Sequence, residues 1–469
     1  VGAPLVATSG NRSGEPLCHA SAEALEQLGE IADAFLVHNR AIARPLDDSL
    51  LQLIDGRPAL LRRARGFAPE ALRLPAPPPA DQTVLALGGD LKAAPALAAG
   101  GHVWMSPHLG DLGSPTLLRR LHSGLECLLE RHQPDPMALV SDAHPGYGSH
   151  QLAQRLSRRR AVPLQCVQHH LAHGLAVVAE HGLTGPVLVW ACDGLGYGTV
   201  ESCGSDHRLW GGELLWLDAA EAAELKARRL ACLRPWPLPG GARAMAEPRR
   251  AALGLLAEAG WLDHPGAAAC RAAFEPQAWN LLLKALESGC HSPRTSSLGR
   301  LFDAAASLLD LVQLLSYEGQ AGLLLEGQAR CATRPLPAPR PVPPVTPALP
   351  PAPPSPLPLG WLDWAPLIGS LLTGRQAGCS TASLAALWHL QLSKALVALV
   401  LKAARQQGCR QVALAGGCFQ NALLLETCIA ELRAANLAVY WSEQVPRNDG
   451  GLALGQLLAA CGDVSITGL

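Results

Sequence analysis

The segment Pro186–Gly198, with the sequence PVLVWACDGLGYG, decides the fold. Its six apolar residues, 186–191, predict a buried strand, and the aspartate and glycines after them predict a turn at the end of that strand. The same order of buried strand and glycine turn recurs at 84–89 and 411–417. Helical patterns separate these strands, at 116–131, 384–406 and 421–434. Strands that alternate with helices predict an α/β fold.

The composition is that of a folded protein without a nucleic-acid or membrane partner. The 469 residues allow two to four domains, at roughly 150 residues each. Hydrophobic residues make up 49% of the chain, and the formal net charge is −1 with no long basic run. The apolar stretch 390–400 is interrupted by polar residues, so it predicts no membrane span. The 14 cysteines include no C-x-x-C pair, which argues against a zinc ribbon and favours reduced thiols in a cytoplasmic protein.

Proline-rich stretches divide the chain. We expect a first unit at 1–72, a linker at 73–81 and a second unit at 82–469. The second unit carries an insertion at 335–358, where 13 prolines in 24 residues exclude a helix or a central strand.

Apolar runs in the first unit predict strands at 5–7 and 34–37. An Asp-Gly turn between 50–54 and 58–61 predicts a hairpin. The chain begins with Val1 and enters an apolar run at once, so we expect the amino-terminal part of a longer protein to be absent.

Two histidines lie one helical turn apart in the sequence VQHHLAH. If this segment opens a helix, His169 and His173 share a face and can bind one metal ion, while His170 points elsewhere. The pair is incomplete as a site, and paired helix histidines also occur on surfaces or in hydrogen bonds. Asp193 and Asp449 could complete a ligand set suited to zinc or iron, although either aspartate also fits a plain turn.

Glycine turns follow three of the predicted strands. They contain Gly88 and Gly89, Gly194 and Gly196, and Gly416 and Gly417. None of them forms a Walker A loop or a convincing dinucleotide fingerprint. Backbone N–H groups at such turns can bind phosphate oxygens, so the three turns together predict a nucleotide cleft between two lobes. Lys92 follows the first turn and could contact phosphates or be a solvated lysine.

Residues 82 to 463 resemble the TsaD-like domain of HypF, the carbamoyltransferase of NiFe-hydrogenase maturation, and so a two-lobed member of the actin-like ATPase superfamily. The matching stretches are Gly88–Lys92, Ser106–Leu112, Val167–His173, Asp193–Gly198, Trp210–Glu213, Leu233–Pro235, Pro239–Gly241, Glu247–Arg250, Ser297–Asp303, Tyr317–Ala321, Gly416–Asn421 and Val445–Gly451. The His-x-x-x-His and Asn-Asp-Gly-Gly patterns also fit TsaD, the tRNA threonylcarbamoyl-adenosine enzyme. The Trp-Gly-Gly-Glu and Tyr-Glu-Gly-Gln patterns favour HypF.

The first unit resembles the trailing half of the YrdC-like domain of HypF. The matching stretches are Thr8–Pro16, His38–Arg40, Asp47–Ser49 and Arg62–Pro69. The resemblance implies a partial YrdC-like α/β unit whose concave nucleotide-binding surface includes Ser9, Asn11, Arg63 and Arg65. Guanidinium groups suit phosphates, with solvated surface arginines as the alternative. The acylphosphatase domain, the zinc segment and the leading half of the YrdC-like domain of the family are missing.

The resemblance implies transfer of a carbamoyl group from carbamoyl adenylate, made with ATP, to the carboxyl-terminal cysteine of HypE. A divalent ion (iron, zinc or magnesium) would be held by His169, His173, Asp193 and Asp449. The nucleotide would be bound by Glu318, Gly416, Gly417 and Asn421 on the adenosine side, and by Lys92, Gly194 and Gly196. Two alternatives remain open: an RNA-modifying enzyme of the TsaD type, which the lack of a basic face disfavours, and a truncated, non-catalytic nucleotide-binding protein.

Overall fold

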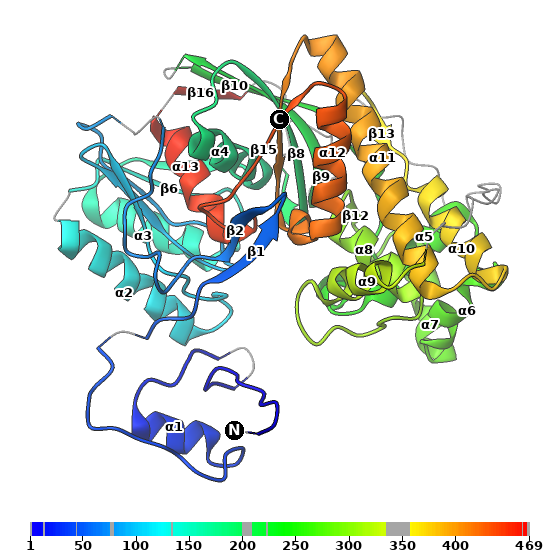
Figure 1. Cartoon of the computed structure of the whole chain (residues 1–469), viewed down its shortest axis with the longest axis horizontal. Helices are drawn as coiled ribbons and strands as arrows, with labels where there is room; N and C mark the ends of the chain where they lie inside the picture. The colour runs from blue at the N-terminus through cyan, green and yellow to red at the C-terminus, as the bar shows by residue number, and fades with distance from the viewer. Residues whose placement is uncertain are drawn as a thin grey trace.

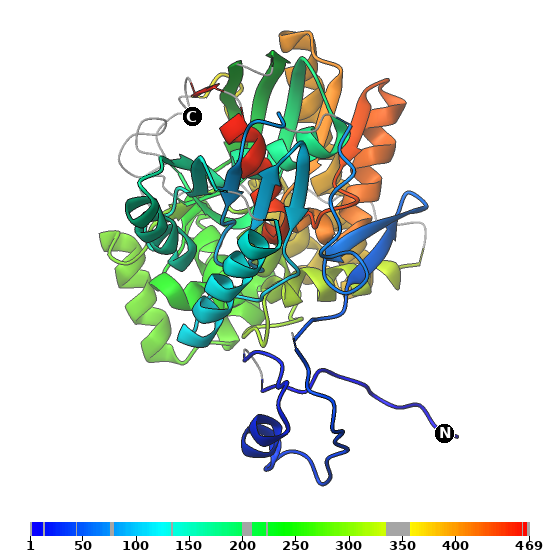
Figure 2. The ribbon, with the colours of Figure 1, turned by 90° about the vertical axis from the view of Figure 1, so that its left-hand side faces the viewer.

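The computed structural model describes residues 2–12, 15–43, 45–75, 79–132, 135–198, 209–221, 224–333, 357–461 and 463–466 (Figure 1). Most of the predicted proline-rich insertion at 335–358 lies outside these residues. The described residues form two large sheets with helices around them and a separate two-stranded hairpin. Two views at right angles show that the segment before residue 45 projects from this body (Figures 1 and 2). Arg120 nevertheless contacts it by donating to the carbonyl of Leu17 over 3.0 Å.

The first sheet has five strands in the described part of the chain, in the order β5-β4-β3-β6-β7. They are β3 (Val84–Ala86), β4 (Ala96–Ala99), β5 (His102–Met105), β6 (Ala138–Asp142) and β7 (Leu164–Val167). Helices α2 (Pro115–His132) and α3 (Gly148–Arg160) cover one face of this sheet. They do so because leucines recur every three or four residues along α2 and form one apolar stripe, which is buried.

The second sheet is larger and has the path β11-β12-β9-β8-β14-β15; in addition β10 pairs with β9, and β13 and β16 both pair with β10. Its strands are β8 (Pro186–Tyr197), β9 (Leu209–Glu221), β10 (Glu224–Leu233), β11 (Trp236–Pro237), β12 (Arg294–Thr295), β13 (Trp361–Leu362), β14 (Gln411–Ala415), β15 (Ala438–Trp441) and β16 (Asp463–Ile466). The outer helices are α5 (Pro248–Ala259), α6 (Ala268–Ala272), α7 (Pro276–Ser288), α8 (Leu298–Leu308), α9 (Gln320–Arg330), α10 (Ala365–Gln376), α11 (Thr381–Gln407) and α12 (Ala422–Ala434).

Two helices lie between the sheets, α4 (His169–His181) and α13 (Leu452–Cys461), and share one apolar core with both of them. Strand β8 separates this inner core from the outer one, because alternate residues of a strand point to opposite faces. Val187 and Val189 enter the inner core, whereas Leu188 and Trp190 enter the outer one. Helices α4 and α13 pack closely because Gly455 has no Cβ, which would collide with the carbonyl oxygen of Ala172.

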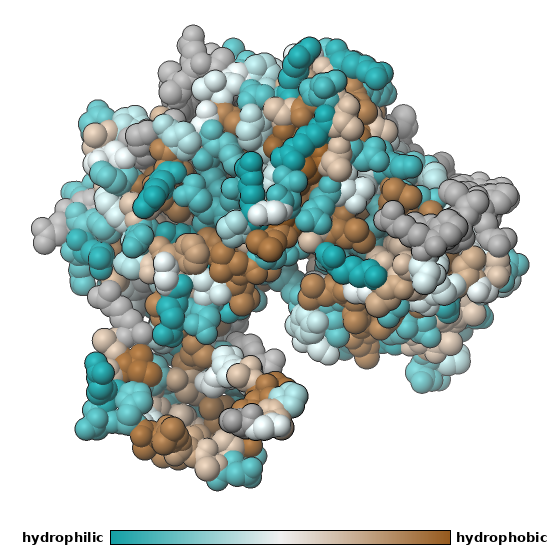
Figure 3. Space-filling model, viewed as in Figure 1, coloured by the Kyte–Doolittle hydropathy of each residue, from teal (hydrophilic) through white to brown (hydrophobic). Residues whose placement is uncertain are grey.

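The first unit is only partly as predicted. The hairpin is confirmed, with β1 (Leu50–Ile54) paired antiparallel to β2 (Arg57–Arg62). The strands predicted at 5–7 and 34–37 are wrong, because neither run has a neighbouring strand to take its backbone hydrogen bonds. Val6 and Leu36 are almost fully exposed. Apolar side chains accordingly gather on the surface of this segment, which contains the short helix α1 (Ser21–Leu28) (Figure 3).

Helix α11 is long and apolar enough, by those two measures alone, to cross a membrane. More than half of its apolar window is buried inside this protein, where it packs against α9, α10 and α12. This burial is typical of the core helix of a globular lobe.

Candidate metal centre

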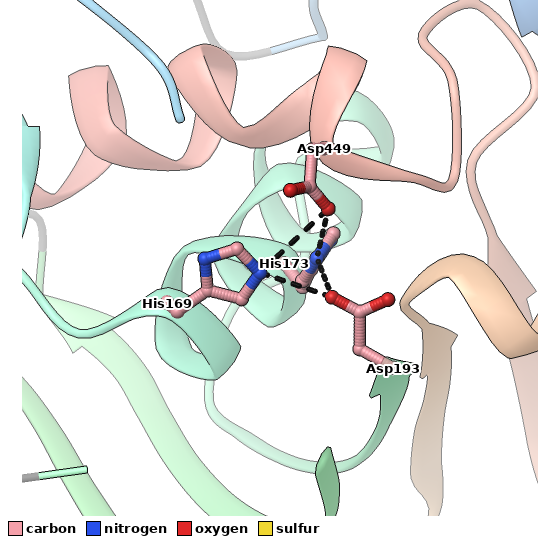
Figure 4. A group of neighbouring side chains, drawn as sticks. All are labelled: His169, His173, Asp193 and Asp449. Atoms are coloured by element: carbon pink, nitrogen blue, oxygen red, sulfur yellow. Dashed lines mark hydrogen bonds and ion pairs between the residues drawn. The ribbon is translucent and has the colours of Figure 1, made fainter. Parts of the chain in front are cut away.

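Four buried side chains converge where the two sheets face the inner helices (Figure 4). His169 and His173 lie in the first turns of α4, Asp193 lies in β8, and Asp449 begins the short 3₁₀ turn Asp449–Gly451 before α13. One ligand atom from each residue lies within 4.8 Å of all the others. The predicted grouping is therefore present in the structure, including the aspartate from near the far end of the chain.

The distances fit a single small cation. The Nε2 atom of His169 lies 3.0 Å from Asp193 Oδ2 and 3.7 Å from Asp449 Oδ1. The Nε2 atom of His173 lies 3.2 Å and 3.5 Å from the same two atoms. Tetrahedral ligands at roughly 2.0–2.2 Å from zinc lie about 3.4 Å from one another. Two imidazoles and two carboxylates at these separations suit a divalent ion such as zinc or iron.

Local sequence features fix each ligand. Helix α4 begins at His169 because the Gln168 side chain accepts a hydrogen bond from the N–H of Leu171, which caps the helix. The pairing of β8 with β9 is irregular between Cys192 and Gly196, so Asp193 lies inside the strand at a bulge rather than at its end. Before α13, the Asn448 side chain accepts the N–H of Gly450 and so holds the turn that carries Asp449.

The positive charges of the imidazoles and the negative charges of the carboxylates in this cluster stabilise one another. Burial alone would lower the pKa of His169, but the carboxylates of Asp449 and Asp142 outweigh it and hold that pKa well above its ordinary value. Burial would raise the pKa of Asp449, and so would Asp193, yet the two imidazoles lower it to about 2. The four groups therefore favour two positive charges facing two carboxylates.

The glycines of two turns lie near this cluster and differ in the space around their backbone. Gly416 has a φ of +96°, and a Cβ there would meet the carbonyl oxygen of Cys192. The N–H of Gly417 donates to Asp193 Oδ1 over 3.2 Å. Gly194 has open space where a Cβ would be, whereas a Cβ at Gly196 would collide with the ring of His170.

Three other predicted nucleotide ligands already have partners. Lys92 forms an ion pair with Glu318, which joins the loop after β3 to the segment before α9. Asn421 caps α12 by accepting the N–H of Leu424, and its Nδ2 lies 2.9 Å from His389 Nε2. A nucleotide at these positions would have to displace existing contacts.

None of the contacts described for the predicted residues of the first unit involves a cluster residue. Ser9 and Asn11 are in the segment before residue 45, where Asn11 donates to the carbonyl of Glu15. Arg63 is buried and donates to the carbonyls of Met105, Phe67 and Glu70, which assigns it to packing. Arg65 is exposed and pairs with Asp48 over 3.1 Å.

Sequence reasoning assigned no role to several titratable residues, two of which lie beside the cluster. Asp142 contacts His169. Burial raises the pKa of Tyr147, and the nearby carboxylates of Asp449 and Asp193 raise it further. Arg300 and Asp303 form a buried pair 2.6 Å apart, and burial raises the pKa of Asp303 to about 6. A signal for Asp142 exists in the sequence, because an aspartate at the carboxyl end of a buried strand tends to face a cleft.

Comparison with known proteins places these features in one family. Residues 189–456 match the family described as "Carbamoyltransferase, Kae1-like Domain, second subdomain", and residues 79–180 match the HypF Kae1-like domain. Residues 1–64 match the Sua5, YciO and YrdC family described as "Telomere recombination".

Several carbamoyltransferases are similar along most of the chain. HypF of Synechocystis is 37% identical over 97% of this chain and 57% of its own length. A HypF homologue of Cupriavidus necator is 38% identical over 80% of this chain and 91% of its own length. The crystal structure of full-length HypF in a phosphate- and nucleotide-bound form is 30% identical, with a TM-score of 0.83 over 97% of this chain and 56% of that chain. The chain thus spans little more than half the length of the full-length relatives it matches.

Proposed function

We propose, since the chain belongs to the HypF family of carbamoyltransferases, that it transfers a carbamoyl group from carbamoyl adenylate to the carboxyl-terminal cysteine of HypE. The observation that carries this proposal is the buried cluster of His169, His173, Asp193 and Asp449, whose four potential ligand atoms lie within 4.8 Å of one another. The family relationship supports the reaction, and the cluster supports a cation site that could assist it.

The proposed step is an acyl substitution. The thiolate sulfur of the acceptor forms a bond to the carbamoyl carbon, and the bond from that carbon to the phosphate oxygen breaks. The electron pair leaves with AMP, so the products are a thiocarbamate and AMP. A divalent ion held by the four residues would attract the phosphate oxygens and favour departure of the negative leaving group.

Residues of the cleft would position the nucleotide. The backbone at Gly194 is open to a ligand, and the Gly416–Gly417 turn lies against Asp193. Lys92 would reach the phosphates, and Glu318 the adenosine side, once their mutual ion pair separates. ATP enters the proposal as the source of the adenylate, and a relative of known structure has been captured with phosphate and nucleotide.

The acceptor would bring its own nucleophile. Burial raises the pKa of the Cys418 thiol well above its ordinary value, and the charge of Asp193 raises it further. Burial does the same for Cys192, the residue before Asp193. Neutral thiols are poor nucleophiles, so these two neighbours of the cluster favour an external cysteine. The need for a reduced thiol also fits action in the cytoplasm.

The test supplies the chain with preformed carbamoyl adenylate and HypE. We expect mass spectrometry to find one carbamoyl group on the terminal cysteine and an equal amount of AMP in solution. HypE without its last residue is the matched control and should remain unmodified. Release of AMP at the same rate with both acceptors, and no modified cysteine, would contradict the proposal.

A further inference from the structure

We propose that Asp142 is a positioning residue for the metal ligand His169, an inference that rests on the proposed cation site. The Oδ2 atom of Asp142 lies 2.7 Å from Nδ1 of His169, which is the shortest contact that this imidazole makes with a carboxylate. Asp142 lies on the opposite side of the ring from the other two carboxylates. It contacts Nδ1, whereas Asp193 and Asp449 contact Nε2.

The pairing of β6 with β7 places the Asp142 carboxylate close to the start of helix α4. Asp142 is the last residue of β6 and lies opposite Val167 of the parallel strand β7. His169 follows Val167 by two residues and begins α4. Because parallel strands end at the same edge of the sheet, the end of β6 faces the first turn of the helix that follows β7.

The contact determines which ring nitrogen is free for a cation. A carboxylate only accepts hydrogen bonds, so Nδ1 of His169 must carry the proton and Nε2 must supply the lone pair to an ion. A carboxylate behind a metal-bound imidazole also makes the ring a stronger donor and fixes its orientation. Nε2 is the atom of His169 that faces the cluster, so the geometry and the tautomer agree (Figure 4).

A purely structural role does not account for both oxygens of Asp142. Its Oδ1 accepts the backbone N–H of His144 over 2.8 Å, which stabilises the loop after β6. That bond needs one oxygen, and an asparagine could make it as well. The side chain is completely buried, and a buried carboxylate is costly unless its charge is compensated. Only the imidazole of His169, among the contacts described for the Asp142 carboxylate, can carry a compensating charge.

The test compares zinc affinity of the full chain with that of Asp142→Asn, measured by competition with a chromogenic chelator. We expect Asp142→Asn to bind zinc about 10–100-fold more weakly. The matched control is Asp90→Asn, since Asp90 holds the same loop through the N–H groups of Gly148 and Ser149 without contacting a cluster residue. The zinc affinity of Asp90→Asn should stay within about twofold of that of the parent chain, because Asp90 contacts no metal ligand.

A second measurement does not depend on the variant folding. In the zinc-loaded parent chain labelled with ¹⁵N-histidine, Nδ1 of His169 should carry a proton and Nε2 should be metal-bound. Equal zinc affinity of Asp142→Asn and the parent, or metal bound through Nδ1, overturns the positioning role alone. A parent chain that binds no zinc, iron or magnesium overturns the cation site and this inference together.

Discussion

Two regions of the molecule bury histidines, with opposite consequences for their charge. At the cluster, carboxylates outweigh burial and hold the pKa of His169 well above its ordinary value. At the boundary between the first unit and the first sheet, burial and the charge of Arg62 lower the pKa of His108 to about 4. Burial disfavours the imidazolium in both regions, so the sign of the neighbouring charges decides the outcome.

The two regions are therefore built for different occupants. The cluster holds two carboxylates that need cations, either protons on the two imidazoles or a metal ion. The boundary instead encloses a cavity of about 370 Å³, lined by Leu46, Asp47, His108, Arg120 and Arg131 among others. Its lining mixes arginines with apolar side chains and contains one aspartate, which suits a neutral histidine rather than a bound cation.

The largest expected effect is on the cluster. Replacing His169 and His173 together by alanine removes both nitrogen ligands, so zinc affinity should fall by about 1,000-fold or more, or about 4 kcal/mol. Equilibrium dialysis followed by elemental analysis measures this loss. His170→Gln is the matched control, because His170 is buried in the same helix turn and contacts Gln168 and the edge of the His169 ring, but is not one of the four grouped ligand residues. An unchanged metal content in the double variant would contradict the assignment of His169 and His173 as metal ligands.

The boundary region should lose stability when the buried guanidinium group of Arg63 is removed. Arg63→Ala leaves the carbonyls of Met105, Phe67 and Glu70 without their donor, so the free energy of unfolding should fall by about 3 kcal/mol. Arg65→Ala removes an exposed ion pair and should cost less than about 0.5 kcal/mol. Urea unfolding of the two variants separates them. Equal effects would mean that Arg63 is not a packing residue.

The pH dependence of stability should reveal the boundary histidine. The folded-state pKa of His108 is lowered to about 4, so between pH 6.5 and 4 the unfolded chain binds the proton that the folded chain refuses. Its contribution to stability is therefore present above pH 6.5 and is lost as the pH falls. His108→Gln should lose about 2 kcal/mol less than the parent chain between pH 7 and pH 5. Parallel urea curves at the two pH values measure this, and identical losses would contradict the lowered pKa.

The same comparison shows how much the sequence could predict. His169 and His173 were found because their spacing is local and one helical turn is enough to bring them together. Asp193 was found as a carboxylate after a buried strand, and Asp449 through its turn and the family resemblance. The alternation of strands and helices was enough for the fold class, since each predicted strand at 84–89, 186–191 and 411–417 is buried in the structure.

What the sequence could not supply depends on contacts between distant segments. The role of Asp142 follows from the register of β6 and β7, which no local pattern encodes. The ion pair of Lys92 with Glu318 joins segments separated by more than 200 residues. The strands predicted at 5–7 and 34–37 failed for the same reason, because an apolar run becomes a strand only where a neighbour pairs with it.

The smallest expected effect concerns the ion pair between Lys92 and Glu318. Glu318 raises the pKa of Lys92 to about 12 against the opposing effect of burial. About half of the Glu318 side chain is nevertheless exposed to solvent. A double-mutant cycle of Lys92→Met and Glu318→Gln should therefore give a coupling of less than about 1 kcal/mol in the free energy of unfolding. Added salt should reduce it further. A coupling well above that value would mean that the ion pair stabilises the fold. A weak ion pair can separate readily, as the binding of a nucleotide by Lys92 and Glu318 requires.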